Sequence, residues 1–122
     1  MKILIIDDNE SITNLFSKLA KMKGHECVVV NDGKSGLSML ENQIYDATIL
    51  DISMPEFSGI DIVNALAESG RIKEQNIVVL TASSSSNDEL DVLVQKGVKL
   101  CLRKPMPVHT ILSTLVELAN KS

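Results

Sequence analysis

Residues 1–10 read MKILIIDDNE, and an apolar run from Ile3 to Ile6 ends directly in Asp7 and Asp8. The run lacks the polar alternation of a strand that faces water on one side. Continuous apolar runs of this length are typical of parallel strands that are buried on both faces. The start of the chain therefore predicts a buried strand with two acidic side chains at its carboxyl end.

Four more short apolar runs follow, at Cys27–Val30, Ala47–Leu50, Ile77–Leu80 and Leu100–Leu102. Between the runs, apolar residues recur every three or four positions, which is the spacing of an amphipathic helix. We expect five such helices to bury these stripes. The stripes are Ile12, Leu15, Phe16, Leu19 and Met22; Leu37 and Leu40; Ile62, Val63 and Leu66; Leu90, Leu93 and Val94; and Ile111, Leu112, Leu115 and Leu118.

Several polar residues and glycines mark the expected helix ends. Gly24, Gly70 and Gly97 stand where three of the stripes stop. Ser58 followed by Asp61 has the spacing of a capping pair for the third helix. The alternation of strands and helices predicts an α/β fold, (βα)₅, with right-handed crossovers and helices on both faces of a parallel sheet. We expect a doubly wound five-stranded sheet in the flavodoxin-like order 2-1-3-4-5.

Length and composition restrict the class of protein. A chain of 122 residues predicts one domain, residues 1–122. The net charge of −4 and the three aromatic residues argue against a nucleic-acid surface, which needs clustered basic side chains. Cys27 and Cys101 lie in apolar runs, as expected of free core thiols in a reducing compartment. We see neither a secretion leader nor a membrane span, so we expect a cytoplasmic protein.

Polar side chains end four of the five expected strands. Asp7 and Asp8 follow the first strand, Asp51 the third, Thr81 the fourth and Lys104 the fifth. An aspartate after a strand is often only a turn or cap residue. In open α/β sheets, however, the carboxyl ends of the strands are where ligands bind. We therefore expect these side chains to form one site.

The residue types predict a particular chemistry. Three clustered carboxylates repel one another, which raises the pKa of at least one of them and favours a cation. Hard oxygen ligands suit Mg²⁺, bound by Asp7, Asp8 and Asp51. A carboxylate is also a nucleophile for phosphoryl transfer, and Asp51 on the central strand is the best placed. Lys104 and the Thr81 hydroxyl are expected to contact oxygens of the transferred group.

The runs ILIIDD (3–8), ATILDISMPEFSG (47–59), VVLTA (78–82) and LRKP (102–105) resemble the receiver domain of two-component response regulators. The resemblance covers the whole chain. It implies that Asp51 is the phosphoacceptor, that the backbone carbonyl of Ser53 is a further Mg²⁺ ligand and that Lys104–Pro105 is cis. It also implies a phosphohistidine donor, on a sensor histidine kinase or phosphotransfer protein, and an output protein that the residues do not identify.

Two positions depart from the usual pattern of that family. Cys101 stands where receivers usually carry an aromatic residue, and Met106 where phenylalanine is common. We expect the signal to leave through the loop Ser83–Ser86 and the start of the fourth helix; alternatively, Met106 supplies the side-chain rearrangement. Ser53 and Ser83 occupy positions that tune hydrolysis in the family. The last helix lacks the arginine-rich face of dimerising receivers, which favours a monomer.

Three other functions are possible for this topology. A flavin carrier needs phosphate donors after the first strand, where the acidic Asp7–Glu10 segment stands instead. A phosphatase with an aspartate nucleophile needs a second aspartate two residues later, and that position is Ser53. A pseudo-receiver would act as a scaffold without phosphorylation. A nucleotide-binding switch is excluded because the chain has no GxxxxGK[ST] loop.

Overall fold

The computed structural model describes residues 1–82 and 85–121, with only the backbone described for residue 121. Strands and helices alternate along the chain, as predicted. The strands are β1 (Lys2–Ile6), β2 (Glu26–Val30), β3 (Ala47–Asp51), β4 (Ile77–Thr81) and β5 (Leu100–Arg103). The helices are α1 (Glu10–Met22), α2 (Gly33–Asn42), α3 (Gly59–Ser69), α4 (Asn87–Lys96) and α5 (Val108–Lys121), with a short 3₁₀ helix, η1 (Arg71–Glu74), before β4.

The five strands form one parallel sheet in the order β2-β1-β3-β4-β5, which confirms the predicted fold class. The central strands β1, β3 and β4 are buried almost throughout. The register aligns Ile6 with Leu50, Asp51 with Leu80 and Thr81 with Arg103. The polar strand ends are therefore brought to the same edge of the sheet.

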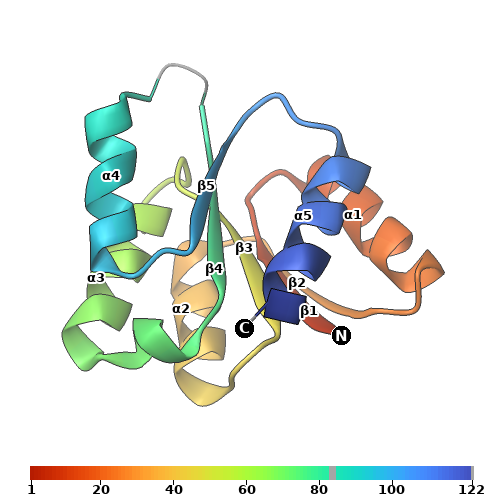
Figure 1. Cartoon of the computed structure of the whole chain (residues 1–122), viewed down its shortest axis with the longest axis horizontal. Coiled ribbons are helices and arrows are strands. Elements are labelled where there is room, and N and C mark those ends of the chain that lie inside the picture. The colour runs from red at the N-terminus through yellow and green to blue at the C-terminus, as the bar shows by residue number, and fades with distance from the viewer. Residues whose placement is uncertain (83–84, 122) are drawn as a thin grey trace.

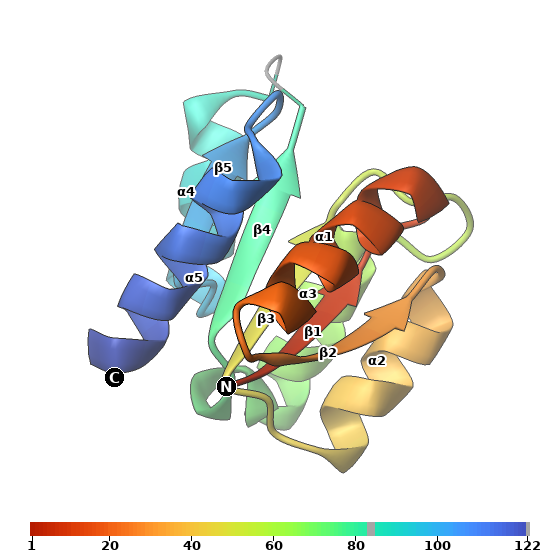
Figure 2. The same ribbon diagram turned by 90° about the vertical axis from the view of Figure 1, so that its right-hand side faces the viewer.

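Helices cover both faces of the sheet. Figures 1 and 2 show α2, α3 and α4 on one face and α1 with α5 on the other. Successive side chains of a strand point to opposite faces, and β1 shows this directly. Leu4 and Ile6 pack with the side chains of α2 to α4, whereas Ile3 and Ile5 pack with those of α1 and α5.

The predicted helix ends are confirmed. Gly70 and Gly97 end α3 and α4 with positive φ, and Gly24 lies just beyond the end of α1 with φ of 86°. Ser58 and Asp61 form the expected capping box, because the side chain of each accepts a hydrogen bond from the backbone N–H of the other.

Part of the predicted core is wrong. Leu15 and Met22 are 57% and 82% exposed, although both belong to the apolar stripe of α1. The buried side of that helix is centred on Thr13, Phe16 and Ala20, so a stripe of five residues is wider than the surface that the sheet covers. Val94 on α4 is 48% exposed for the same reason, since Leu93 is the residue that α4 buries fully.

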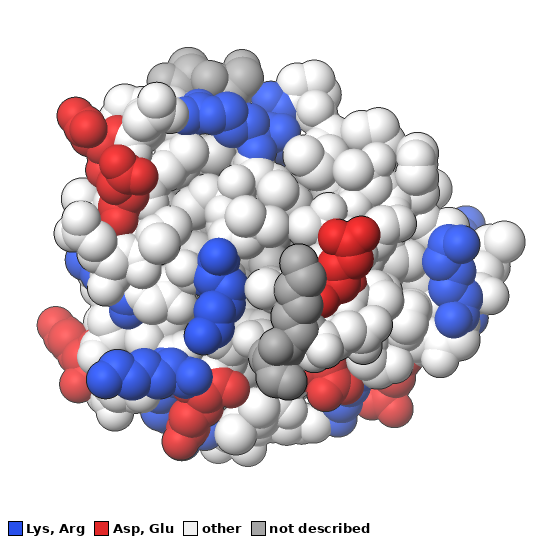
Figure 3. All heavy atoms as spheres, viewed as in Figure 1, with Lys and Arg blue, Asp and Glu red and all other residues white. Residues whose placement is uncertain are grey.

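The charged surface is mixed. On the face that Figure 3 shows, the described acidic and basic side chains are interspersed over the molecule, without a broad area of one sign. Within residues 1–82 and 85–121, none of the helices is long and apolar enough to cross a membrane.

Candidate functional site

Three carboxylates meet at the carboxyl edge of the sheet. Asp7 and Asp8 directly follow β1, and Asp51 is the last residue of the neighbouring strand β3. Each of the three offers one oxygen atom, and these atoms all lie within 4.8 Å of one another. Asp7 and Asp51 are buried, whereas Asp8 is exposed. The structure thus brings together the acidic cluster that the sequence predicted.

Asp7 is held by contacts from several segments. Its backbone N–H donates to the Val30 carbonyl oxygen at 3.1 Å, and its Oδ1 atom accepts from the Asn9 N–H at 2.9 Å. Asn31 Nδ2 donates to the Asp7 carbonyl oxygen at 2.9 Å and to Thr13 Oγ1 at 3.2 Å. Sequence reasoning missed Thr13 and Asn31, although a polar Thr13 beside an apolar stripe was an available clue.

Asp51 is fixed by its own turn and by β4. Its Oδ1 atom accepts a hydrogen bond from the Ser53 N–H at 3.0 Å, and the N–H of the next residue, Ile52, donates to the Leu80 carbonyl oxygen at 3.2 Å. Ser53 therefore lies at the site through its amide; the role of its carbonyl as a metal ligand stays a prediction.

Gly59 is a further residue of the site that sequence reasoning missed. A Cβ atom at this position would lie 2.6 Å from the Asp51 carbonyl oxygen and 2.7 Å from the Ile52 Cα atom. Neither backbone atom can move away freely. The first residue of α3 must therefore be glycine for the helix to pack this closely against the turn that carries Asp51.

Lys104 supplies positive charge beside the cluster. Its Nζ atom lies 3.5 Å from Asp51 Oδ2 and 3.8 Å from Asp7 Oδ2. The Lys104 N–H donates to the Thr81 carbonyl oxygen at 2.8 Å, which fixes the start of its side chain at the end of β4. The Lys104–Pro105 peptide bond is cis, as the resemblance implied.

Burial and the neighbouring carboxylate change the acidity of Asp7. Burial is the largest cause and raises the pKa of Asp7 to about 6, and the charge of Asp51 adds to this. The hydrogen bond from Asn9 and the charge of Lys104 act in the opposite direction. The direction agrees with the sequence prediction, but burial contributes more to the raised pKa of Asp7 than the repulsion by Asp51 on which that prediction rested. The charge of Lys104 therefore offsets only part of the cost of burying the Asp7 carboxylate.

The donor set fits a divalent cation. Asp7 Oδ2 is buried and, among the described residues, accepts no hydrogen bond. Lys104, its charged neighbour, is 3.8 Å away, beyond hydrogen-bonding distance. An unsatisfied buried carboxylate oxygen is costly unless something positive reaches it. Asp7, Asp8 and Asp51 together offer the hard oxygen ligands that Mg²⁺ prefers.

Thr81 completes the set of predicted side chains. It is fully buried at the end of β4, and its hydroxyl is hydrogen-bonded to the hydroxyl of Ser85. Arg103, the register neighbour of Thr81 on β5, also reaches Ser85 through its guanidinium group. Ser83, at a position that by resemblance tunes hydrolysis in the family, lies outside the described residues, as does Ser84.

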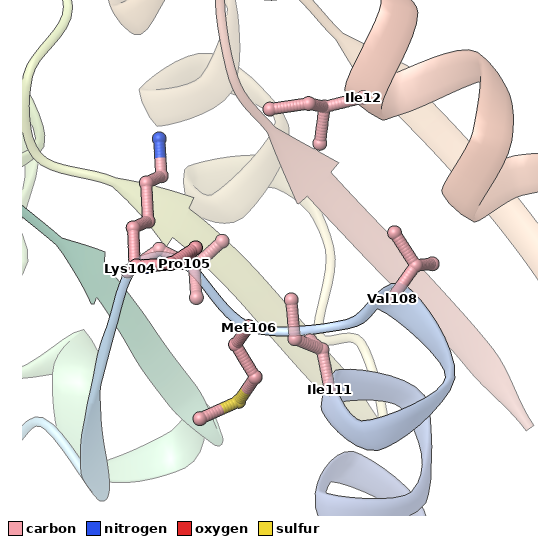
Figure 4. Close-up of a pocket in the computed structure, with 7 residues that line it drawn as sticks. Ile12, Lys104, Pro105, Met106, Val108 and Ile111 are labelled. Atoms are coloured by element: carbon pink, nitrogen blue, oxygen red, sulfur yellow. The ribbon is translucent and has the colours of Figure 1, made fainter.

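An apolar cavity of about 240 Å³ opens beside Lys104. Its lining comes from α1, β4 and the segment from β5 into α5 (Figure 4). The ammonium group of Lys104 points away from Met106 and Ile111, so the lysine contributes its aliphatic stem to the cavity. Met106, at the position where receivers commonly carry phenylalanine, lies on the cavity wall.

Known proteins share this sequence pattern and fold. The chain is 30% identical over 121 residues to the transcriptional regulatory protein CpxR of Escherichia coli K12, which covers 99% of this chain and 50% of CpxR. The chain thus spans about half the length of that relative. The chemotaxis protein CheY4 of Vibrio cholerae superposes with a TM-score of 0.82 at 27% identity, covering 96% of this chain and 97% of CheY4.

A further solved structure has the same fold. It is the receiver domain of the sensor histidine kinase PA1611 from Pseudomonas aeruginosa PAO1, which carries a magnesium ion in its active-site cleft. It superposes with a TM-score of 0.81 at 22% identity, covering 98% of this chain and 97% of that one. The family model of the response regulator receiver domain matches residues 3–116. This chain belongs to the response regulator receiver domain family.

Proposed function

We propose that the whole chain, residues 1–122, is a phosphorylation switch in which Asp51 accepts a phosphoryl group. The observation that supports this most strongly is the setting of Asp51. Its carboxylate is buried, its Oδ1 atom is oriented by the Ser53 N–H, and its Oδ2 atom lies 3.5 Å from the Lys104 ammonium. A carboxylate held between a cation and two further carboxylates is arranged for charge-neutralised phosphoryl transfer.

The donor in this proposal is a phosphohistidine of a sensor histidine kinase or a phosphotransfer protein. A carboxylate oxygen of Asp51 attacks the phosphorus atom, and a new O–P bond forms as the P–N bond to the imidazole breaks. The imidazole leaves with the electron pair of that bond and takes up a proton. Lys104 stabilises the negative charge of the transferred group, and the Thr81 hydroxyl donates a hydrogen bond to it.

Asp7, Asp8, Asp51 and the Ser53 carbonyl would hold Mg²⁺ in this site. When bound, the ion offsets the charge of the carboxylates and of the incoming phosphoryl group. The Asp7 Oδ2 atom, which accepts no hydrogen bond from the part of the chain that the structure describes, supports this assignment, and so does the magnesium ion in the PA1611 receiver domain. The same site would return to its starting state by slow hydrolysis of the aspartyl phosphate.

Output in this proposal is a change in binding to a partner protein. CpxR is a transcriptional regulator of about twice this length, so its whole-protein activity does not transfer to this chain. We further propose that the domain works as a monomer in the cytoplasm. Cys27 and Cys101 are both free, which suits a reducing compartment.

Acetyl phosphate with Mg²⁺ provides the direct test. We expect intact-mass spectrometry to find one added phosphoryl group on the wild-type protein and none on Asp51→Asn. Asp46→Asn is the matched control. It removes a carboxylate that lies away from the cluster and accepts a hydrogen bond from the Lys2 N–H. Labelling of Asp51→Asn to the wild-type extent, or full labelling in excess EDTA, would contradict the proposal.

A further inference from the structure

Arg103 joins β5 to the segment between β4 and α4. It stands beside Thr81 in the sheet register and directly precedes Lys104. One guanidinium nitrogen, Nη1, donates to the Ser85 carbonyl oxygen, and the other, Nη2, donates to Asn87 Oδ1 at 2.8 Å. Asn87 is the first residue of α4. The guanidinium group thus binds the approach to α4 and its first turn at the same time.

Ser85 is the point at which this contact meets the site. Its hydroxyl pairs with the Thr81 hydroxyl, and its N–H donates to the Ala82 carbonyl oxygen at 3.1 Å. Thr81 is fully buried, so its hydroxyl needs a partner within the protein. In the unphosphorylated protein that partner is Ser85. The position of Ser85 is therefore linked directly to the orientation of the Thr81 hydroxyl.

A phosphoryl group on Asp51 would compete for the same hydroxyl. A threonine hydroxyl has a single proton to donate, and phosphoryl oxygens are strong acceptors. If Thr81 moves toward the phosphoryl group to donate to it, the hydroxyls of Thr81 and Ser85 separate, and the contact between them is lost whichever of the two is its donor. An interaction that exists in only one of two states shifts the equilibrium between them by its own free energy. The contact between Thr81 and Ser85 therefore favours the unphosphorylated conformation.

We propose that Arg103 is a positioning residue that holds Ser85 against Thr81 and thereby stabilises the unphosphorylated conformation. Through Asn87 it also links the release of Thr81 to the first turn of α4. This inference rests on the proposed function of Asp51. The planar fork of arginine suits the role because it reaches two acceptors in fixed geometry, which the single ammonium of lysine does not.

Beryllofluoride, a non-covalent mimic of the phosphoryl group, provides the test when it is titrated with Mg²⁺. Because the chain has no tryptophan, calorimetry is a suitable readout. We expect Ser85→Ala and Arg103→Ala each to bind the mimic about two- to tenfold more tightly than wild type, the range that one net hydrogen bond gives. The double variant should bind no more tightly than Ser85→Ala alone, because Arg103 acts through the Ser85 hydroxyl.

Matched controls separate this effect from general destabilisation. Arg71→Ala removes the only other arginine, in η1 before β4, and Ser113→Ala removes a hydroxyl on α5; both should bind the mimic as wild type does. Arg103→Lys should behave as Arg103→Ala, because the single ammonium of lysine does not reach both acceptors in fixed geometry. Asn87→Ala keeps the arginine and removes the acceptor of its Nη2 atom, so it should give a smaller gain even if Arg103 variants fold poorly.

The outcomes that overturn the inference differ from those that overturn the proposed function. Additive gains in the double variant, or single variants that bind as wild type does, would refute the role of Arg103 while Asp51 still binds the mimic. If the wild-type protein does not bind the mimic with Mg²⁺ at all, the proposed function fails and this inference fails with it.

Discussion

The Nζ atom of Lys104 lies 3.5 Å from Asp51 Oδ2 but 3.8 Å from Asp7 Oδ2, so Asp51 is the carboxylate that the lysine approaches more closely. The backbone explains this proximity. The Lys104 N–H is hydrogen-bonded to the Thr81 carbonyl oxygen, and β4 lies next to β3, which ends in Asp51. The ammonium group of Lys104 is therefore placed to neutralise negative charge at Asp51.

Replacing Lys104 by methionine should slow phosphorylation without removing the metal site. A hydrogen bond to a charged group contributes about 1.5–3 kcal/mol, so we expect the initial rate of labelling by acetyl phosphate to fall roughly 10- to 100-fold. Time-resolved intact-mass spectrometry measures this rate. Lys99→Met is the matched control, because Lys99 directly precedes β5 whereas Lys104 directly follows it. An unchanged rate in Lys104→Met would show that the lysine has no part in the transfer.

The raised pKa of Asp7 predicts how stability depends on pH in metal-free protein. The folded pKa is about 6 and the ordinary value is 3.8, so the folded state binds the proton more tightly than the unfolded state. The contribution of Asp7 to stability is fully present below about pH 4 and is lost as the pH rises through about 6. The loss is on the order of 2–3 kcal/mol.

Asp7→Asn isolates this contribution, because the amide oxygen can still accept the hydrogen bond from the Asn9 N–H. Urea unfolding in EDTA at pH 4 and pH 7.5 measures the free energy of unfolding of both proteins. We expect the variant to be the more stable one at pH 7.5 and the difference to shrink at pH 4. The same difference at both pH values would exclude titration of Asp7 as its cause.

Magnesium should stabilise the folded protein by binding only the native cluster. At a concentration one hundred times the dissociation constant, the free energy of unfolding should rise by about 2.7 kcal/mol. Asp8→Ala should lose most of this response and should be at least as stable as wild type in EDTA, since it removes a charge from a repelling cluster. Asp91→Ala, an exposed aspartate on α4, should respond as wild type does. A thermal melt of wild type that does not move with Mg²⁺ would contradict the metal site.

Gly59→Ala should disturb the site through the backbone. The added methyl group would meet the Asp51 carbonyl oxygen at 2.6 Å, so α3 and the turn after β3 must separate. Overpacking of this kind costs about 1–3 kcal/mol of unfolding free energy. Urea unfolding should show this loss, together with slower labelling of Asp51. Ile60→Ala trims an exposed neighbour and should change both quantities much less.

Most of the fold could be predicted because the spacing of the apolar residues and the polar residues that follow the strands indicate the same parallel sheet. The continuous apolar run Ile3–Ile6 indicated a buried parallel strand, and β1 is one. The cluster of Asp7, Asp8 and Asp51 followed from the rule that parallel strands present their carboxyl ends at one edge. The exposure of Leu15 was not predictable in this way. Periodicity assigns a residue to the apolar face of a helix, but it does not show how much of that face packs against the sheet.

The contacts that orient the site could not be predicted from pattern alone. Asn31 reaches the Asp7 carbonyl oxygen from the end of β2, and Arg103 reaches Ser85 across 18 positions of sequence. Such hydrogen bonds depend on the direction of the side chains in the folded protein, and they produce no recurring pattern in the sequence. Gly59 lies in a recognisable capping segment, yet its need for glycine comes from the backbone of Asp51, which only the packed structure reveals.

The last prediction concerns Cys101, at the position where receivers usually carry an aromatic residue. The cysteine is half-buried, packs with the core on the α2–α4 face, and its Sγ atom lies 4.0 Å from the Leu90 carbonyl oxygen. A small side chain in this setting fills space in both states and has little differential contact energy to offer. We therefore expect the response to phosphorylation to leave through Thr81, Ser85 and the first turns of α4. Ser83 and Ser84, part of the loop first expected to move, lie outside the described residues.

Amide chemical shifts recorded with and without beryllofluoride and Mg²⁺ test this expectation. In wild type, the large changes distant from Asp51 should fall between Thr81 and Leu90, and those from Val108 through α5 should be small. Thr81→Ala, which has no hydroxyl to exchange between Ser85 and the mimic, should lose the changes at Ser85 and in α4 while Asp51 still responds. Cys101→Ser, nearly equal in size, should behave as wild type. If the largest distant changes instead run from Met106 through α5, the rearrangement passes through Met106 and the cavity that it lines, and the route through α4 is wrong.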